Sequence, residues 1–261
     1  SVYLWLDTVI LGFMTTGNYQ VGLYQLASRL KSFLGSIITA ATNAAIPRLS
    51  YYMTHGEIDK YRNLLRISLS LLTNVGLCLT GYLVIFSDSV VTIISSAKYL
   101  PSAPALQIIS FALFFSIINA LIGFQILTPS GQESKLAVAS SAGVPVSIIA
   151  NFALDPFLGA IGAAIAASAT ELTVFIVLAT AARKVLRQVT DVSQMLRILV
   201  AVAAASAVSL AFRHLVPGWS SLEIIASSIF SYFAVWLVLL VVLHENSTRL
   251  VLTTLTRRFH K

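Results

Sequence analysis

Residues 159–182 read GAIGAAIAASATELTVFIVLATAA, an apolar run with Glu171 as its one charged residue. Its length matches the roughly 20 residues that a helix needs to cross the hydrocarbon core of a bilayer. The run opens with small residues, which allow helices to approach closely. It lacks the alternation of apolar and polar residues that marks the shorter strands of a membrane barrel. This stretch therefore predicts a transmembrane helix, and its small residues predict tight packing.

The composition of the whole chain agrees with a membrane protein. Hydrophobic residues make up 57% of the sequence and charged residues 10%, whereas a soluble domain carries about 25% charged residues. The net charge is +7, but the basic residues stand beside apolar runs, so we expect membrane lipids and no nucleic acid as partners. The lone cysteine, Cys78, lies inside an apolar run and excludes an intramolecular disulfide.

Apolar runs divide the chain into about eight transmembrane helices, which predicts an all-α, polytopic membrane bundle. The expected spans are residues 1–14, 20–46, 66–86, 104–128, 136–154, 159–182, 196–213 and 222–243. The first run would reach only about 21 Å as a helix, so we expect that upstream sequence is missing. After residue 86, the chain forms either a short surface helix capped by Ser87 or Asp88, or an irregular end. Pro47 is expected to stop the second helix.

Lysine and arginine residues fall mostly on one side of this succession of spans. That side holds Arg48, Lys60, Arg62, Arg66, Lys135, Arg183, Lys184, Arg187, Arg197, Arg249, Arg257, Arg258 and Lys261. The opposite side holds Lys98 and Arg213. Because cytoplasmic loops of membrane proteins are enriched in Lys and Arg, the basic side and the C-terminus are predicted to be cytoplasmic. The tail, residues 246–261, either lies on anionic lipid as an interfacial helix or is a frayed basic end.

Charged residues within the expected spans are candidate functional residues, because a charge at membrane depth is costly and usually faces a cavity or a partner. Glu171 lies near the middle of its span, where it either couples transport to an ion or forms a structural hydrogen bond between helices. We expect it to face the bundle interior. Asp7 either pairs with Arg29 or Lys31, or stands near a substrate path.

The second span carries a polar stripe that predicts a water-filled lumen. The stripe consists of Gln25, Arg29, Ser32, Ser36 and Asn43. We favour Arg29 as its substrate-binding cation, the alternative being that Arg29 extends to the membrane surface. Lys31 lies about 200° around the helix from Arg29, so both are not expected to point straight into one lumen. The sequence shows no catalytic, nucleotide-binding or metal-ligand motif, so we expect neither an enzyme nor a cofactor.

Several short motifs follow one another in a recognisable order. They are Asp7 with Ile10-Leu11-Gly12, Val21-Gly22-Leu23-Tyr24, Ala45-Ile46-Pro47-Arg48-Leu49-Ser50, Gly131-Gln132-Glu133-Ser134-Lys135, and Asn151 with Pro156, Gly159 and Gly162-Ala163-Ala164-Ile165-Ala166. With them, the sequence resembles the C-terminal half of the lipid-linked oligosaccharide and polysaccharide flippases. These exporters share a superfamily with multidrug and toxin extrusion (MATE) transporters and lipid II flippases. One departure is Ser95-Ser96-Ala97-Lys98, where the family usually has a glycine before the tyrosine corresponding to Tyr99; it affects a surface turn.

The resemblance implies a MATE-like fold of two six-helix lobes around a central cavity. Residues 1–185 would form the second lobe with a truncated first helix, residues 186–245 two additional transmembrane helices, and residues 246–261 a basic cytoplasmic tail. The protein would flip a polyprenyl-diphosphate-linked oligosaccharide across the plasma (inner) membrane by alternating access, for exopolysaccharide or O-antigen biosynthesis. Its partners would be the missing N-terminal lobe and a polysaccharide polymerase or glycosyltransferases.

Arg29 would suit the diphosphate, because a planar guanidinium pairs well with phosphate oxygens. Two alternatives stay open. One is an ion-coupled multidrug exporter of the same superfamily, in which Glu171 and Asp7 bind cations. The other is a non-transporting membrane scaffold of a polysaccharide synthase complex, in which the buried polar residues only join helices.

Overall fold

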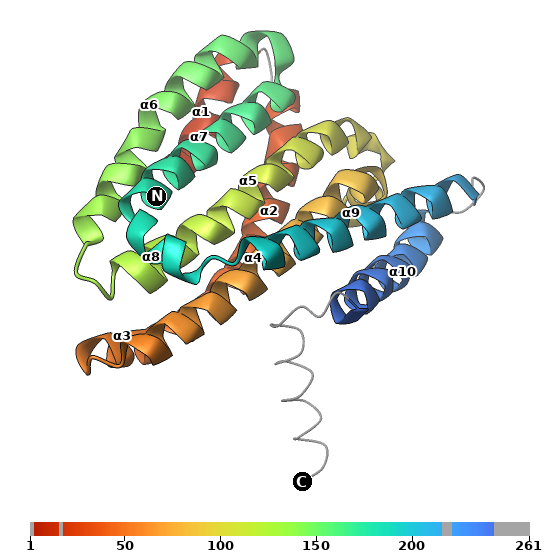
Figure 1. Cartoon of the computed structure of the whole chain (residues 1–261). Helices are drawn as coiled ribbons and strands as arrows, with labels where there is room; N and C mark the ends of the chain where they lie inside the picture. The colour runs from red at the N-terminus through yellow and green to blue at the C-terminus, as the bar shows by residue number, and fades with distance from the viewer. Residues whose placement is uncertain (1–2, 16–17, 216–220, 243–261) are drawn as a thin grey trace.

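The computed structural model describes residues 3–15, 18–215 and 221–242, which form a bundle of helices without strands in these ranges (Figure 1). The helices are α1 (Tyr3–Met14), α2 (Tyr19–Asn43), α3 (Ile46–Thr54), α4 (Ile58–Ile94), α5 (Ala103–Leu121), α6 (Glu133–Leu158), α7 (Ala160–Ala181), α8 (Arg183–Val189), α9 (Val192–Leu215) and α10 (Ser221–Val242). A 3-10 helix, η1 (Ala97–Ser102), precedes α5, and a π-helix, η2 (Ile122–Leu127), extends it. The predicted all-helical membrane bundle is confirmed.

Each of the eight expected spans coincides with a helix of the structure. In the described ranges, 6 helices are long and apolar enough to cross a membrane: Ile58–Ile94, Ala97–Leu127, Glu133–Leu158, Ala160–Ala181, Val192–Ala211 and Leu222–Val242. The remaining two expected spans correspond to α1, which is 12 residues long, and to α2, which carries the polar stripe. Many large apolar side chains point outward, such as Phe13 at 84% exposed and Phe157 at 85%. In a bilayer these side chains would contact lipid.

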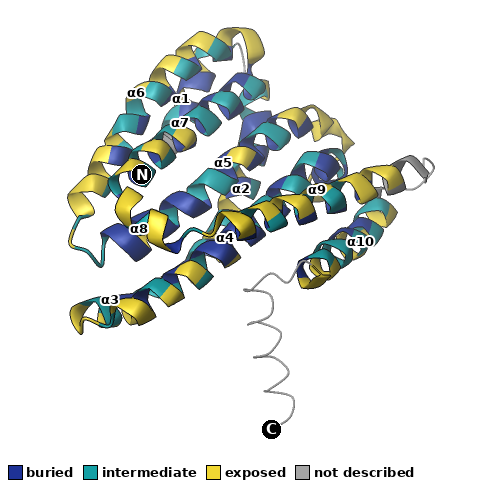
Figure 2. Cartoon of the chain, viewed as in Figure 1, coloured by how far each residue is buried: buried dark blue, intermediate teal, exposed yellow. Residues whose placement is uncertain are grey.

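The helices pack in the order α6, α7, α5 and α4, with α1 against α6 and α2 against α5 and α7 (Figure 1). Helices α9 and α10 pack against each other and against α4. Buried residues line the facing sides of α4, α5 and α7, whereas α6, α9 and α10 present exposed residues to the outside (Figure 2). The hydrophobic core therefore lies around α4, α5 and α7.

The connections between helices alternate between the two ends of the bundle, as the charge pattern predicted. At one end, the backbone N–H of Ala160 donates to Gln20 Oε1 at 3.0 Å, which joins the α1–α2 and α6–α7 connections. At the other end, Arg66 Nη2 donates to the carbonyl oxygen of Gln188 at 3.4 Å, which joins α4 and α8. Lys60 lies near the start of α4, and Lys98 follows its far end. The 37-residue helix is about 55 Å long.

Helix α4 extends the third span beyond its expected end at residue 86. The backbone angles at Phe86 (φ −107°, ψ 16°) are non-helical, so a kink there divides the element into two helical segments, the second of which runs to Ile94. A short helix after residue 86 was one of the two expected alternatives, but Ser87, Ser89, Val90 and Val91 are buried, so this segment packs inside the bundle. The Ser87 side chain is buried and its Oγ accepts a hydrogen bond from Gln107 Nε2 at 2.9 Å. The polar residues that suggested a helix end mark a contact with α5.

The end of α2 differs from the prediction as well. The helix ends at Asn43, before Pro47, which lies instead in the first turn of α3, where its missing N–H costs nothing. Gln125 in the π-helix donates from Nε2 to the carbonyl oxygen of Thr42 at 3.0 Å, and thus satisfies a backbone acceptor near the end of α2. The expected loop before the third span is also shorter, because α4 begins at Ile58. The predicted basic tail, residues 246–261, lies outside the described ranges.

The small residues at the start of α7 allow a close contact between α7 and α6. Gly159 turns the chain with φ +55°, and the alanines Ala160, Ala163, Ala164 and Ala166 are buried. A Cβ on Gly162 would lie 2.8 Å from the carbonyl carbon and oxygen of Leu154 in α6. Because backbone atoms cannot move aside as a flexible side chain can, only glycine fits here. The predicted tight packing is confirmed.

We expect Gly162→Ala to lower the thermal stability of the detergent-purified protein, since overpacking typically costs about 1–3 kcal/mol. Gly22→Ala is the matched control, because nothing lies within 4 Å of a Cβ at Gly22. The measurement is the melting temperature of each variant. Equal melting temperatures for the two variants would contradict the close α6–α7 contact.

Candidate functional site

A polar cavity of about 400 Å³ lies between α2 and α5. It is lined by Lys31, Ser32, Gly35, Ser36, Thr39, Ala40, Asn43, Leu113 and Ser116. Ser32, Ser36 and Asn43 are exposed on the side of α2 that other described helices leave uncovered. Hydroxyl groups, an amide and an ammonium group therefore face one space in an otherwise apolar bundle.

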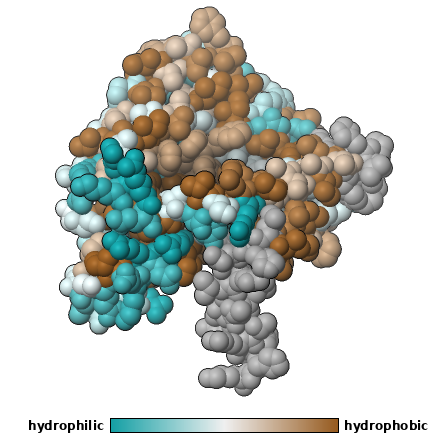
Figure 3. All heavy atoms as spheres, in the orientation of Figure 1, coloured by the Kyte–Doolittle hydropathy of each residue, from teal (hydrophilic) through white to brown (hydrophobic). Residues whose placement is uncertain are grey.

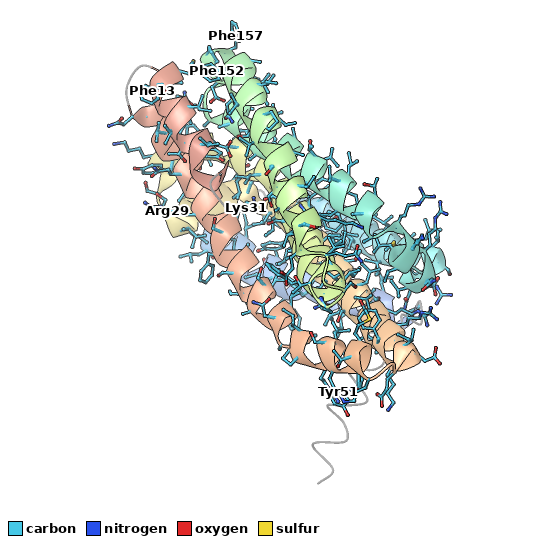
Figure 4. The ribbon with its side chains drawn as sticks, turned by 90° about the vertical axis from the view of Figure 1, so that its left-hand side faces the viewer. Phe13, Arg29, Lys31, Tyr51, Phe152 and Phe157 are labelled. Carbon is cyan, nitrogen blue, oxygen red and sulfur yellow. The ribbon has the colours of Figure 1, made fainter. Side chains whose placement is uncertain are left out.

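Part of the predicted polar stripe lines the cavity, and the cationic residue in its wall is Lys31 and not the predicted Arg29. Ser32, Ser36 and Asn43 line the cavity, whereas Gln25 and Arg29 are not among its lining residues. Lys31 lies about 100° to one side of Ser32 on the helix, and Arg29 about 60° to the other side. Arg29 is exposed, and it forms no ion pair within the described residues (Figure 4). The sequence favoured Arg29 for this lumen, but the cavity wall contains Lys31.

Lys31 pairs with Glu171 across the interface of α2 and α7. The Lys31 Nζ to Glu171 Oε1 distance is 3.0 Å, and both side chains are buried. Asn119 of α5 donates from Nδ2 to Glu171 Oε2 and to the Glu171 carbonyl oxygen, each at 3.0 Å. Glu171 is 3% exposed, so the prediction that it faces the bundle interior is confirmed. An ammonium group has three N–H donors. One N–H donor of Lys31 is used in the hydrogen bond to Glu171, at the edge of the cavity.

Asp7 lies in a second polar cluster and accepts hydrogen bonds from three neutral side chains. Tyr24 Oη donates to Oδ2 at 3.1 Å, while Ser147 Oγ and Asn151 Nδ2 donate to Oδ1 at 2.8 Å and 2.7 Å. The cluster joins α1, α2 and α6. Asp7 forms a salt bridge with neither Arg29 nor Lys31 among the described side chains.

Asp155 completes this cluster and was missed in the sequence. It lies one turn beyond Asn151 on α6, is 0% exposed, and interacts electrostatically with Asp7. Neither of its carboxylate oxygens has a hydrogen-bond partner in the described part of the chain. The residue follows the expected span 136–154 and precedes Pro156, so it looked like a loop residue. The available signal was the spacing of Asn151 and Asp155, which places them on one helical face.

Two buried carboxylates, of which only Asp155 has oxygens without a hydrogen-bond partner in the ranges that the structure describes, can hold a positive charge between them. A buried carboxylate without a partner is costly, whereas an oxygen-binding cation or a shared proton removes that cost. The described residues contain no cluster of three or more His, Cys, Asp or Glu side chains of the kind that holds a metal ion. The two carboxylates of the cluster can share a monovalent cation or a proton.

Comparisons with known proteins show which proteins this chain is similar to. No family model matches the chain. AglR of Haloferax volcanii, provisionally named a flippase, is 27% identical over 171 residues, which are 63% of this chain and 34% of AglR. A Shigella dysenteriae protein provisionally named an O-antigen transporter is 26% identical over 174 residues, which are 67% of this chain and 43% of that protein.

The fold matches that of the lipid II flippase MurJ in its inward closed conformation, with a TM-score of 0.69 and 16% identity. The match covers 91% of this chain and 50% of MurJ. The chain is therefore similar in sequence to proteins named as a flippase and an O-antigen transporter, and similar in fold to a lipid II flippase. It spans half or less of the length of each of these relatives.

The Lys31–Glu171 pair predicts a clear pattern in a double-mutant cycle of this protein. Lys31→Met and Glu171→Gln should each lower the melting temperature, because breaking a buried pair costs about 3–5 kcal/mol. The double variant Lys31→Met/Glu171→Gln should recover much of the loss, since neither charge is then left unpaired. Thermal unfolding of the purified variants measures this. Additive losses in the double variant would show that the two side chains do not interact.

Proposed function

We propose that this chain is the second lobe of a transporter that flips a polyprenyl-diphosphate-linked oligosaccharide across the plasma membrane. The single observation that carries the proposal is the polar α2–α5 cavity with Lys31 in its wall, set within helices that are long and apolar enough to span a membrane. The similarity to flippases supports it. Polysaccharide biosynthesis at the cell surface is the process that such a substrate serves.

The cavity offers groups that match both parts of this substrate. Ser32, Ser36, Thr39 and Asn43 offer hydroxyl and amide groups that can bind sugar hydroxyls. The Lys31 ammonium would bind the diphosphate, with Arg29 as a second cation on the adjoining exposed face. Burial among apolar helices strengthens such charge pairing, because little water screens it. The missing lobe would close the cavity from the other side.

Transport would proceed as the two lobes rock about this cavity. In this arrangement residues 1–185 move as one lobe, and residues 186–245 contribute the additional pair of helices. Two other functions considered from the sequence, a multidrug exporter and a non-transporting scaffold, are not favoured. A scaffold would leave the Lys31 cavity without a purpose.

Asp7 and Asp155 are proposed as the site where a cation is coupled to this movement. The cluster joins α1 and α2 to α6. A cation bound there changes the net charge at the contact between these helices, which move together when the lobe rocks. Glu171, by contrast, is already paired with Lys31 and is assigned to positioning that residue.

The transport hypothesis predicts that cations of the cavity face are needed for export. Arg29→Ala should reduce polymer export about tenfold or more at normal protein level, since a hydrogen bond to a charged group contributes about 1.5–3 kcal/mol. Arg29→Lys should retain part of the activity, because it keeps the charge but loses the planar guanidinium. The Lys31→Met/Glu171→Gln variant should also lose export. Lys98→Gln is the control, because Lys98 follows the far end of α4 and does not line the cavity. Export at the parental rate in Arg29→Ala, in Arg29→Lys and in Lys31→Met/Glu171→Gln would refute the proposal.

The coupling site predicts that Asp155→Asn abolishes the response of transport to one cation. Export is measured in sodium chloride against choline chloride at constant pH, and then across a pH series in choline. Asp59→Asn removes an exposed carboxylate from the first turn of α4 and serves as the control. A parental response to sodium or to protons that persists in Asp155→Asn would exclude this cluster as the coupling site.

The orientation proposed from the charge pattern places the end with Lys60 and Arg187 in the cytoplasm. Cysteine introduced at Lys98 should react with an impermeant thiol reagent in intact cells, and cysteine at Lys60 or Arg187 only after permeabilisation. Native Cys78 is buried and provides a low background. The opposite labelling pattern would invert the proposed topology.

A further inference from the structure

A cationic cavity of about 390 Å³ lies at the end of the bundle where α7 ends and α6 begins. Three cations, Lys135, Arg183 and Lys184, line it together with the polar side chains of Ser130, Gln132 and Thr180. None of the residues that line it is acidic. Lys135 Nζ donates to Gln132 Oε1 at 2.6 Å, which holds the lysine at the cavity. Hydrophilic atoms gather over this end of the molecule, near α3 and α8 (Figure 3).

An apolar cavity of about 410 Å³ borders the π-helix and α8, both of which also line the cationic cavity. It lies between α4, α5, α7 and α9, and its walls include Leu77, Phe114 and Phe175. Ile122 of the π-helix and Leu186 of α8 line this cavity, whereas Ile126 and Val185 line the cationic one. Ile122 and Ile126 are one helical turn apart, about 6 Å along the axis.

The two cavities face different surroundings along the bundle. The apolar one lies among helices long and apolar enough to span the membrane, so its natural filling is hydrocarbon. The cationic one lies where α7 gives way to α8, a short helix with exposed Arg183, Lys184 and Arg187 and a buried Val189. Exposed cations next to buried apolar side chains are typical of a helix at the membrane surface, where lipid phosphates lie.

We propose that the pair of cavities binds one anionic phospholipid. Its phosphate would contact Lys135, Arg183 and Lys184, because arginine and lysine form charge-assisted hydrogen bonds with phosphate oxygens. One acyl chain would fill the apolar cavity beneath α8. The choice of an anionic lipid follows from the three cations and the absence of an acidic side chain in the cavity wall. The proposal does not depend on the transported substrate.

The site gives the lipid a structural role. Helix α8 connects α7, in the core of the lobe, to α9 and α10. A lipid seated against both α8 and the π-helix would hold this connection in place, and thereby the position of α9 relative to α4. Ligands that bind only the folded state stabilise it by mass action. Anionic phospholipid should therefore raise the stability of the protein more than a zwitterionic lipid does.

The test uses delipidated, detergent-purified protein and two lipids with the same acyl chains, dioleoyl-phosphatidylglycerol and dioleoyl-phosphatidylcholine. Native mass spectrometry gives the bound lipid, and thermal unfolding gives the stabilisation. The parent should bind phosphatidylglycerol about tenfold more tightly than phosphatidylcholine, because both lipids carry the phosphate but the three cations of the cavity repel the choline cation of phosphatidylcholine. The variant Lys135→Gln/Arg183→Gln/Lys184→Gln should bind the two lipids equally.

A matched control removes the same charge elsewhere at this end of the bundle. Arg48→Gln/Lys60→Gln/Arg62→Gln loses three cations from α3 and α4 and should keep the preference for phosphatidylglycerol. Leu199→Trp narrows the apolar cavity from α9, where Leu199 is 49% exposed, and should weaken both lipids severalfold. Because Leu199 is half exposed, this variant tests the acyl-chain site without a substitution in the core.

Four results would overturn the proposal. The first is equal binding of the two lipids by the parent, and the second is an equal loss of preference in both triple variants. The third is displacement of phosphatidylglycerol by inorganic phosphate at the same concentration, which would assign the cationic cavity to a free anion. The fourth is displacement by an equal concentration of a polyprenyl phosphate, which would assign both cavities to the transported lipid.

Discussion

Polar groups inside this bundle lie in a region from which the bilayer excludes water, so a polar side chain there is stabilised by a partner within the protein or by a bound ion. That constraint explains the contacts that hold the helices together. Lys31 is matched by Glu171, and Gln125 of the π-helix by the last turn of α2. Gln107 and Ser87 join α5 to the segment of α4 that follows the kink at Phe86. Most of these contacts join helices that are distant in sequence, and they set how the helices pack.

The same constraint attaches α9 and α10 to the lobe. Helix α4 presents Asn74, Cys78 and Tyr82, spaced by four residues, along one face. Trp236 Nε1 donates to Asn74 Oδ1, and Tyr232 Oη donates to the Cys78 carbonyl oxygen, both at 3.1 Å, while Tyr82 Oη lies 3.1 Å from Ser228 Oγ. Apolar contact alone would let α10 slide along α4, since lipid is as apolar as the helix surfaces. This row of hydrogen bonds sets the register of α10 on α4.

The two charged clusters meet on one helix. Tyr24 of α2 donates to Asp7, and Lys31, about two turns further along, pairs with Glu171. The part of α2 that runs from Lys31 to Asn43 lines the cavity. A change of charge at Asp7 and Asp155 therefore acts on α2, the helix that also carries Lys31, the residue proposed to bind the diphosphate. Rigid movement of α2 is the simplest physical link between cation binding and the substrate cavity.

Local sequence was sufficient to predict the helical spans, their alternation between two ends, the close packing at Gly162 and the burial of Glu171. Each of these depends on residues within one helix: hydrophobic length, flanking charge, small side chains, or the cost of a carboxylate in hydrocarbon. Tertiary structure decided which charges meet. Lys31 and Glu171 are 140 residues apart, as are Asp7 and Ser147. Helical spacing gives the angle between Arg29 and Lys31 but not the neighbour that each one faces. The assignment of Lys31 to the cavity, the burial of the helical segment after Phe86 and the place of Asp155 beside Asp7 all depend on contacts between distant helices, which no local pattern encodes.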